Sequence, residues 1–151
     1  MAIVLVLLAC AYIAVLAFLY RNQEAMIFPG AKAHGAPPSL SGYVGQTLEL
    51  ESEWPGQVYK AWYFRRETSR GTILYLGGNA SCMVEERDRL VWLAQNFEMS
   101  IITLDFPGYG ANPGQPGQRQ ILDLLRRWMV HFEKELKLPS ESFVYFGHSL
   151  G

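Results

Sequence analysis

The residues best suited to chemistry stand at the end of the chain, where Gly147-His148-Ser149-Leu150-Gly151 has the form G-x-S-x-G. The apolar run 142–147 leads into this segment and is typical of a buried strand. A serine on a tight turn after a strand has its hydroxyl pushed into a cleft, where it can attack an acyl group. The pattern therefore predicts acyl transfer, with Ser149 as the catalytic nucleophile.

Such a serine needs a histidine to take its proton and an acid to orient that histidine. The chain has three histidines, His34, His131 and His148, and none is expected to be this base. His148 is adjacent to Ser149, and neighbouring side chains on a strained turn point apart. Where this turn occurs, the acid and the histidine follow the serine in chain order. Both partners are therefore expected outside the 151 residues.

A second candidate element is Gly77-Gly78-Asn79-Ala80, which follows the apolar run 72–78. An oxyanion hole needs backbone N–H groups aimed at one point, and small residues let the main chain approach a substrate. The expected donors are the N–H groups of Asn79 and Leu150, with Ala80 as a further candidate. The alternative is a plain glycine turn between a strand and a helix.

Asp105 ends the apolar run 99–106 and opens the glycine- and proline-rich segment that follows. It precedes Ser149 in the chain, so a structural role is expected for it rather than a place in a catalytic triad.

Composition excludes some functions. The chain has 13 basic and 14 acidic residues, a net charge of -1 and no basic run, so nothing favours nucleic-acid binding. Cysteine and histidine do not occur at zinc-ligand spacing, and no metal or other cofactor is expected. Half of the residues are apolar, as in a chain that forms a core.

The elements that must position these residues follow the order of an α/β domain. Alternating segments at 47–53 and 58–66, joined by a Pro-Gly turn, predict an antiparallel hairpin. Buried parallel strands then alternate with amphipathic helices, the first of them capped by Ser81. The strands are expected at 72–78, 99–106 and 142–147, and the helices at 81–97 and 119–138.

Residues 2–20 are uncharged and apolar, and Arg21 ends the run. Nineteen helical residues span roughly 28 Å, close to the hydrocarbon thickness of about 30 Å. A retained transmembrane anchor in the lipid bilayer is expected, on an undetermined side. A cleaved signal peptide is the alternative, although a basic n-region is missing, and LLAC at 7–10 fits a lipoprotein box poorly. The expected division is an anchor at 1–21, a juxtamembrane linker at 22–44 and a domain at 45–151.

Together, LYLGGNA, LDFPGYG and FGHSLG, in this order behind an anchor and an MIFPG patch, resemble the α/β-hydrolase superfamily. The closer resemblance is to membrane-anchored members called lysophospholipase-like or serine-aminopeptidase-like. It implies the N-terminal half of an α/β-hydrolase fold, an antiparallel hairpin followed by parallel β-α-β-α-β. Two positions depart from the family pattern, Gly77 where histidine is usual and Pro107 where arginine is frequent.

The resemblance implies a membrane-anchored serine hydrolase that cleaves ester, thioester or amide bonds of a small acyl substrate. The 151-residue chain is expected to be inactive without the acid and the histidine. The alternative is a non-catalytic, truncated remnant or binding domain held at the membrane. In either case residues 142–147 are expected at a sheet edge, with Phe143, Val144, Tyr145 and Phe146 partly uncovered.

Overall fold

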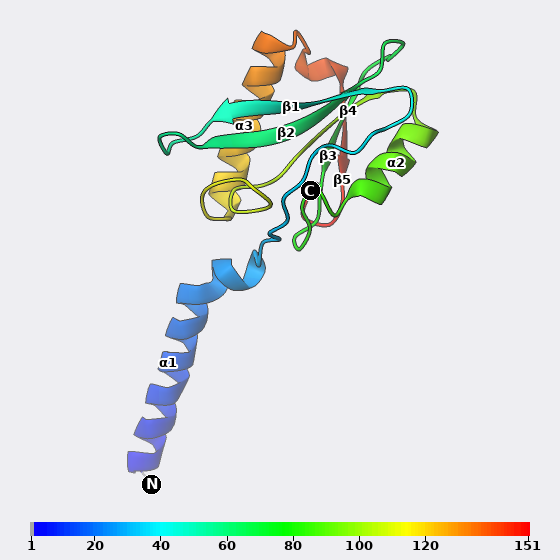
Figure 1. Cartoon of the computed structure of the whole chain (residues 1–151). Coiled ribbons are helices and arrows are strands. Elements are labelled where there is room, and N and C mark those ends of the chain that lie inside the picture. The colour runs from blue at the N-terminus through cyan, green and yellow to red at the C-terminus, as the bar shows by residue number, and fades with distance from the viewer. Residues whose placement is uncertain (1) are drawn as a thin grey trace.

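The computed structural model of the chain describes residues 2–151, and Met1 lies outside the described residues. A long helix stands apart from a domain built on a five-stranded sheet (Figure 1). The elements in chain order are α1 (Ala2–Ile27), β1 (Val44–Glu51), β2 (Val58–Arg65), β3 (Thr72–Leu76), α2 (Arg87–Asn96), β4 (Ser100–Leu104), α3 (Gln118–Glu135), a short 3₁₀ turn (Ser140–Ser142) and β5 (Phe143–Gly147).

The sheet has the strand order β1-β2-β4-β3-β5. β1 and β2 form the expected antiparallel hairpin, and β2 also pairs antiparallel with β4. β3 lies between β4 and β5 and is parallel to both. The expected hairpin followed by parallel β-α-β-α-β is therefore confirmed as part of an α/β fold.

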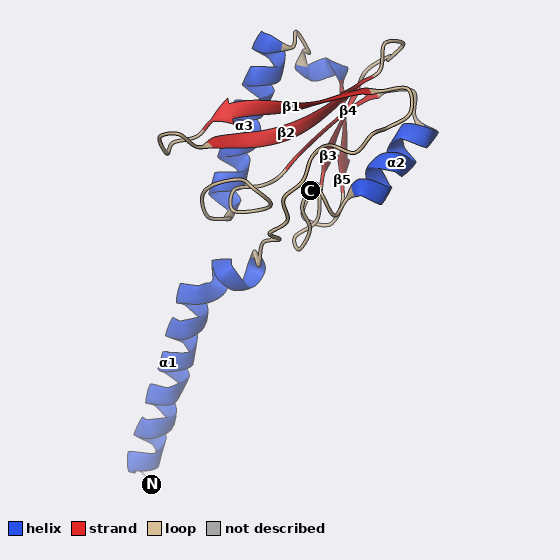
Figure 2. Cartoon of the chain, in the orientation of Figure 1, coloured by secondary structure: helices blue, strands red, loops and turns tan. Residues whose placement is uncertain are grey.

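Each face of the sheet is covered by one helix (Figure 2). Strand side chains alternate between the two faces, so Ile73 and Tyr75 pack with α2 while Leu74 packs with α3. The two helices differ in what they bury. α2 contributes Leu90 and Leu93, whereas α3 contributes Ile121, Leu124, Trp128 and Phe132.

The helix expected at 81–97 is shorter than predicted and begins at Arg87. Ser81 does not cap it, because its hydroxyl accepts a hydrogen bond from the Gly78 N–H at 3.2 Å. Glu86 occupies the N-cap position without a side-chain capping bond. The polar residues before the helix therefore support the loop after β3 rather than a helical turn.

α1 extends the expected anchor to Ile27, and its apolar side chains are exposed. Within the described residues it is the one helix long and apolar enough to cross a membrane, with a mean hydropathy of 3.0. A signal sequence near an N-terminus has the same properties. The segment after α1 is not free of the domain, since Phe28, Ala31 and Leu40 are buried there.

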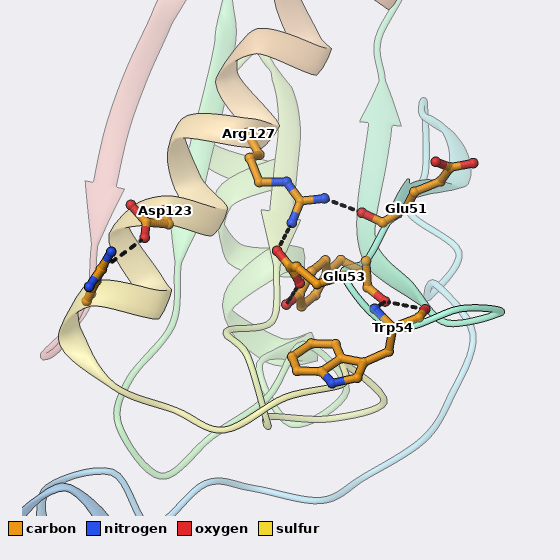
Figure 3. Close-up of polar contacts among 8 residues, drawn as sticks. Glu51, Glu53, Trp54, Asp123 and Arg127 are labelled. Atoms are coloured by element: carbon orange, nitrogen blue, oxygen red, sulfur yellow. Dashed lines mark hydrogen bonds and ion pairs between the residues drawn. The ribbon is translucent and has the colours of Figure 1, made fainter.

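The hairpin is tied to α3 by a polar cluster (Figure 3). The Arg127 guanidinium on α3 donates to the Glu53 carboxylate and to the Glu51 carbonyl, and it lies over the Tyr59 ring at 5.5 Å. The Tyr59 hydroxyl donates to Glu53 at 3.0 Å. Burial, together with the neighbouring Glu53 carboxylate, raises the pKa of Tyr59 to about 12. The cluster fixes α3 over one face of the sheet.

β5 is an edge strand, as expected from the sequence. Val144 is 48% exposed and Tyr145 is 59% exposed, while Phe146 is half-buried. Phe143 differs from the expectation because it is buried against Phe132 of α3, at 5.8 Å between ring centroids. The exposed part of β5 is therefore the part that leads into G-x-S-x-G.

Candidate active site

The G-x-S-x-G segment forms a tight turn at the end of β5. Ser149 has φ of 59°, a backbone conformation that non-glycine residues rarely adopt and that costs on the order of 1–3 kcal/mol. A side chain at Gly147 would collide with the Gly151 carbonyl, and one at Gly151 would collide with the Leu76 carbonyl. The two glycines are therefore required by close backbone approach. The exposed Ser149 sits on the strained corner between them.

The turn lies beside the loop that follows β3. The His148 N–H donates to the Leu76 carbonyl at 3.0 Å, which continues the parallel β3–β5 pairing past the end of β5. The His148 ring packs against Gly78, where an added Cβ would lie 3.3 Å from Nδ1. The Gly77–Ala80 loop and the serine turn thus meet at the carboxyl ends of two neighbouring parallel strands.

A buried carboxylate supports the loop after β3. Glu86 accepts hydrogen bonds from the Ser81 hydroxyl at 2.5 Å, the Tyr75 hydroxyl at 2.6 Å and Arg89 Nε at 3.0 Å. Burial works against the charge, but these hydrogen bonds together hold the pKa of Glu86 below its ordinary value. Through Ser81 the network reaches the Gly78 N–H and fixes the backbone of the loop.

The side chain of Asn79 is also held at both ends. Its Nδ2 donates to the Ile27 carbonyl, and its Oδ1 accepts from the Tyr109 hydroxyl at 2.8 Å. The backbone N–H of Asn79, one of the predicted oxyanion donors, is thus carried by a residue with a fixed side chain. Leu150, the other predicted donor, is 37% exposed beside Ser149.

Asp105 is buried at the end of β4, and its Oδ1 accepts from the Met83 N–H at 2.7 Å. Its other oxygen fills the space where a side chain on Gly110 would have to lie. Burial raises the pKa of Asp105 to about 6. These contacts are with backbone and fit the structural role expected for Asp105.

The structure does not bring a base to Ser149 within residues 2–151. His34 is exposed, and the His131 ring packs against Trp128 at 5.4 Å between centroids. His148 Nδ1 is buried and has no hydrogen-bond partner in the described chain. The catalytic role of Ser149 and the oxyanion roles of Asn79 and Leu150 stay predictions from the sequence.

A cavity of about 570 Å³ opens next to Leu150. Its walls come from the last turns of α1 and the first turns of α3, including Ile27, Phe28 and Ile121. This volume is within the range of small-molecule sites, about 300–1,000 Å³. The cavity lies between the end of α1 and the serine turn, and Gln23, Glu24 and Gln118 line it together with the apolar side chains.

Sequence reasoning did not identify Glu86 and Tyr109 as part of this region. The signal for Tyr109 is weak because its partner Asn79 lies 30 residues away in the sequence. The partners of Glu86 are nearer in sequence, but Tyr75 lies on β3 and Ser81 in the loop that follows it, so no helical or strand periodicity marks the contacts. One available signal was the position of Tyr109 between two glycines, where the backbone turns back toward the strand ends.

No family model matches the chain. Among curated proteins, it is 29% identical over 143 residues to Rv2307c, an uncharacterized protein of Mycobacterium tuberculosis, covering 91% of this chain and 49% of the relative. It is 25% identical to the uncharacterized membrane protein YNL320W of Saccharomyces cerevisiae, covering 89% of this chain and 49% of the relative. The chain therefore spans about half the length of these relatives.

A further relative is the α/β hydrolase domain-containing protein aho-3 of Caenorhabditis elegans, 24% identical over 83 residues. These residues are 55% of this chain and 25% of the relative.

Solved structures of the same architecture are esterases and hydrolases. The Pyrococcus furiosus esterase Pf2001 superposes with a TM-score of 0.58 at 20% identity, over 81% of this chain and 49% of its own. An α/β hydrolase of Vibrio vulnificus gives a TM-score of 0.55 at 16% identity, over 67% of this chain and 34% of its own. The resemblance to the α/β-hydrolase superfamily is confirmed, and the chain has part of the α/β-hydrolase fold.

Proposed function

We propose that this chain carries the nucleophile and the oxyanion loop of a membrane-anchored serine hydrolase. Ser149 Oγ attacks the carbonyl carbon of an ester, thioester or amide and gives its proton to the histidine. The histidine passes this proton to the leaving group as the bond to that group breaks, which gives an acyl-enzyme. The N–H groups of Asn79 and Leu150 stabilise the oxyanion of the tetrahedral intermediate. Water then attacks the acyl-enzyme and releases the carboxylic acid product from Ser149.

The conformation of Ser149 is the observation that carries the proposal. A non-glycine residue at φ of 59°, between two glycines that cannot accept a side chain, gives a strained turn at a strand end. Such strain persists where the surrounding structure holds it, and it is frequent at active sites. The loop beside it is held by a hydrogen-bond network through Ser81 and Glu86, and a fixed backbone of this kind is what an oxyanion hole requires.

The acid and the histidine come from sequence beyond the described residues. Two observations support this part of the proposal. The relatives are about twice as long as the aligned region. In addition, the strand that carries the serine is an exposed edge, which further strands and a helix would cover. The chain without these partners is inactive.

α1 anchors the chain in the lipid bilayer. Its apolar side chains are exposed over its whole length, and contiguous apolar surface of this extent is unfavourable in water. The matched Saccharomyces cerevisiae relative carries the description of a membrane protein. A chain of this kind should sediment with membranes and resist carbonate extraction, whereas a mature product that lacks residues 1–20 would establish a cleaved signal peptide.

The catalytic proposal is tested with two versions of the protein. The first is the 151-residue chain, and the second is the gene read past codon 151, each assayed with p-nitrophenyl esters and acyl thioesters in detergent. Loss of the base of a serine triad costs on the order of a millionfold in kcat, so the shorter chain should show no turnover above background. The longer product should turn over, and Ser149→Ala should abolish this activity.

Ser142→Ala is the matched control, because Ser142 is a serine near β5 whose hydroxyl only donates to the Pro139 carbonyl. Full loss of activity in Ser149→Ala with retention in Ser142→Ala supports the proposal. Turnover of the longer product that survives Ser149→Ala would contradict it. A longer product without any turnover on these substrates would favour the non-catalytic, membrane-tethered alternative.

A further inference from the structure

The segment that follows α1 is docked onto the domain. Phe28 and Ala31 are each 8% exposed, and Phe28 belongs to the same core cluster as Phe106 and Tyr109. The Gly110 N–H donates to the Ala31 carbonyl at 2.6 Å. The chain leaving the membrane-spanning helix therefore runs directly over the loop that follows β4.

The carbonyl groups at the end of α1 also need hydrogen-bond donors. The last four carbonyls of a helix lack intrahelical donors. The Glu24 carbonyl accepts from the Phe28 N–H at 2.8 Å, and the Ile27 carbonyl accepts from Asn79 Nδ2. A residue 52 positions away thus satisfies the final carbonyl of the helix.

The other end of the Asn79 side chain is bound by the hydroxyl of a buried tyrosine. Tyr109 is fully buried, and its ring packs edge-on against Phe106 at 5.7 Å between centroids. Its hydroxyl donates to Asn79 Oδ1 at 2.8 Å. Because the donor and the acceptor ends of the amide are both engaged, the orientation of the Asn79 side chain is set.

We propose that Asn79 and Tyr109 are positioning residues that clamp the predicted oxyanion loop to the end of the membrane helix. The oxyanion role of the loop rests on the proposed function, whereas the clamp itself rests on these contacts. The end of α1 is then a structural part of the site and holds the loop that carries the Asn79 N–H. Loosening the helix end loosens the loop, and the coupling is reciprocal.

The clamp is tested by hydrogen–deuterium exchange on the full 151-residue chain in lipid nanodiscs that hold one copy each. Asn79→Asp keeps an oxygen for the Tyr109 hydroxyl but removes the donor to the Ile27 carbonyl. Tyr109→Phe keeps the ring and removes only the hydroxyl. Tyr59→Phe is the matched control, since it removes a hydroxyl that donates to Glu53 in the hairpin.

Both clamp variants should raise the rate of amide exchange in residues 77–81 and in 24–31 by about three- to tenfold. An increase of this size corresponds to the loss of one net hydrogen bond. In Tyr109→Phe, the backbone amide signal of Asn79 in a ¹H–¹⁵N spectrum should also shift and broaden. Tyr59→Phe should leave both segments and this signal unchanged. Exchange in β4, residues 100–104, should be the same in all variants.

Two results would overturn the clamp: unchanged exchange at 24–31 in Asn79→Asp, or an increase that is equally large in β4 and therefore global. Neither measurement requires turnover. The clamp can fail while Ser149 proves to be a nucleophile, and it can hold while the longer product proves inactive, so the two proposals are separable.

Discussion

The two loops that meet at the candidate site are held in different ways. The loop after β3 follows an interior strand, and Glu86, Ser81, Tyr109 and the end of α1 all contact it. The serine turn follows an edge strand, is exposed, and is fixed through backbone contacts to Leu76 and within the turn itself. The comparison shows that the loop predicted to carry the oxyanion donors is supported by side chains from several elements, whereas the turn that carries Ser149 is supported mainly by backbone contacts.

The largest expected effect on stability comes from removing a side chain of α3 that covers the interior strands. Trp128 is fully buried on α3 and stacks on Phe132 at 5.4 Å between centroids. Trp128→Ala should reduce the free energy of unfolding by about 3–5 kcal/mol, through lost burial and the cavity that remains. Urea unfolding of the full chain measures this. Trp92→Ala, at a position 48% exposed on α2, should cost far less, and an equal loss in the two variants would contradict the assigned core.

The raised pKa of Asp105 should make the stability of the chain depend on pH. Its pKa is raised from 3.8 to about 6, so the folded chain keeps a proton that the unfolded chain releases in this range. The stability contributed by this group is present below pH 4 and declines as pH rises through 6. Between pH 4 and 7.5 the decline should be about 2 kcal/mol.

The measurement is the free energy of unfolding of Asp105→Asn relative to the unsubstituted chain across this pH range. The relative stability of the variant should rise with pH. Asp123→Asn, an exposed carboxylate on α3, is the control. A relative stability of Asp105→Asn that is flat from pH 4 to 7.5 would refute the buried, proton-binding carboxyl.

The support of the loop after β3 can also be weakened directly. Glu86→Gln keeps the shape of the side chain but removes the charge that Ser81, Tyr75 and Arg89 share. The free energy of unfolding should fall by about 1–3 kcal/mol, because buried partners lose a charged acceptor. The pKa of Glu86 is lowered, so the difference from the unsubstituted chain should shrink as pH falls below the ordinary value of 4.5.

Chemical denaturation at pH 7 and at pH 3.5 measures the difference in the free energy of unfolding between Glu86→Gln and the unsubstituted chain. Glu133→Gln, an exposed carboxylate on α3, should be nearly neutral at both. If Glu86→Gln were also neutral at pH 7, the support assigned to the loop after β3 would be absent.

The smallest effect on stability is expected at the β5 edge. Val144→Lys with Tyr145→Lys should change the free energy of unfolding by no more than about 0.5 kcal/mol, because both side chains are already exposed. Charges on an exposed edge oppose pairing with another chain, so self-association of the protein in detergent should fall. Light scattering measures this. Val130→Lys, at a similarly exposed position on α3, should not reduce association. Equal reduction by Val130→Lys would show that the edge is not responsible.

The edge position of β5 was expected from the resemblance to part of a larger fold rather than from a local pattern. The local patterns were sufficient to predict the hairpin and the order of strands and helices. Each of these depends on alternation, helical spacing and glycine turns within short segments. The predicted start of α2 was wrong because Ser81 hydrogen-bonds to Gly78 in the loop after β3, and Glu86 hydrogen-bonds to Tyr75 on β3. The pairing of Asn79 with Ile27 and Tyr109 could not be foreseen for the same reason. Such contacts are set by tertiary packing, which leaves little trace in local sequence.

The central claim is that Ser149 is the nucleophile of a hydrolase whose base and acid lie beyond the described residues. Its most direct test is mass-spectrometric detection of the acyl group on tryptic peptides after brief reaction with a p-nitrophenyl ester and acid quenching. The product read past codon 151 should carry the acyl group on Ser149, and the 151-residue chain should carry none above background. Acylation of Ser149 in the 151-residue chain at the rate of the longer product would place a base within residues 2–151. Acylation of the longer product at any other residue would contradict the account.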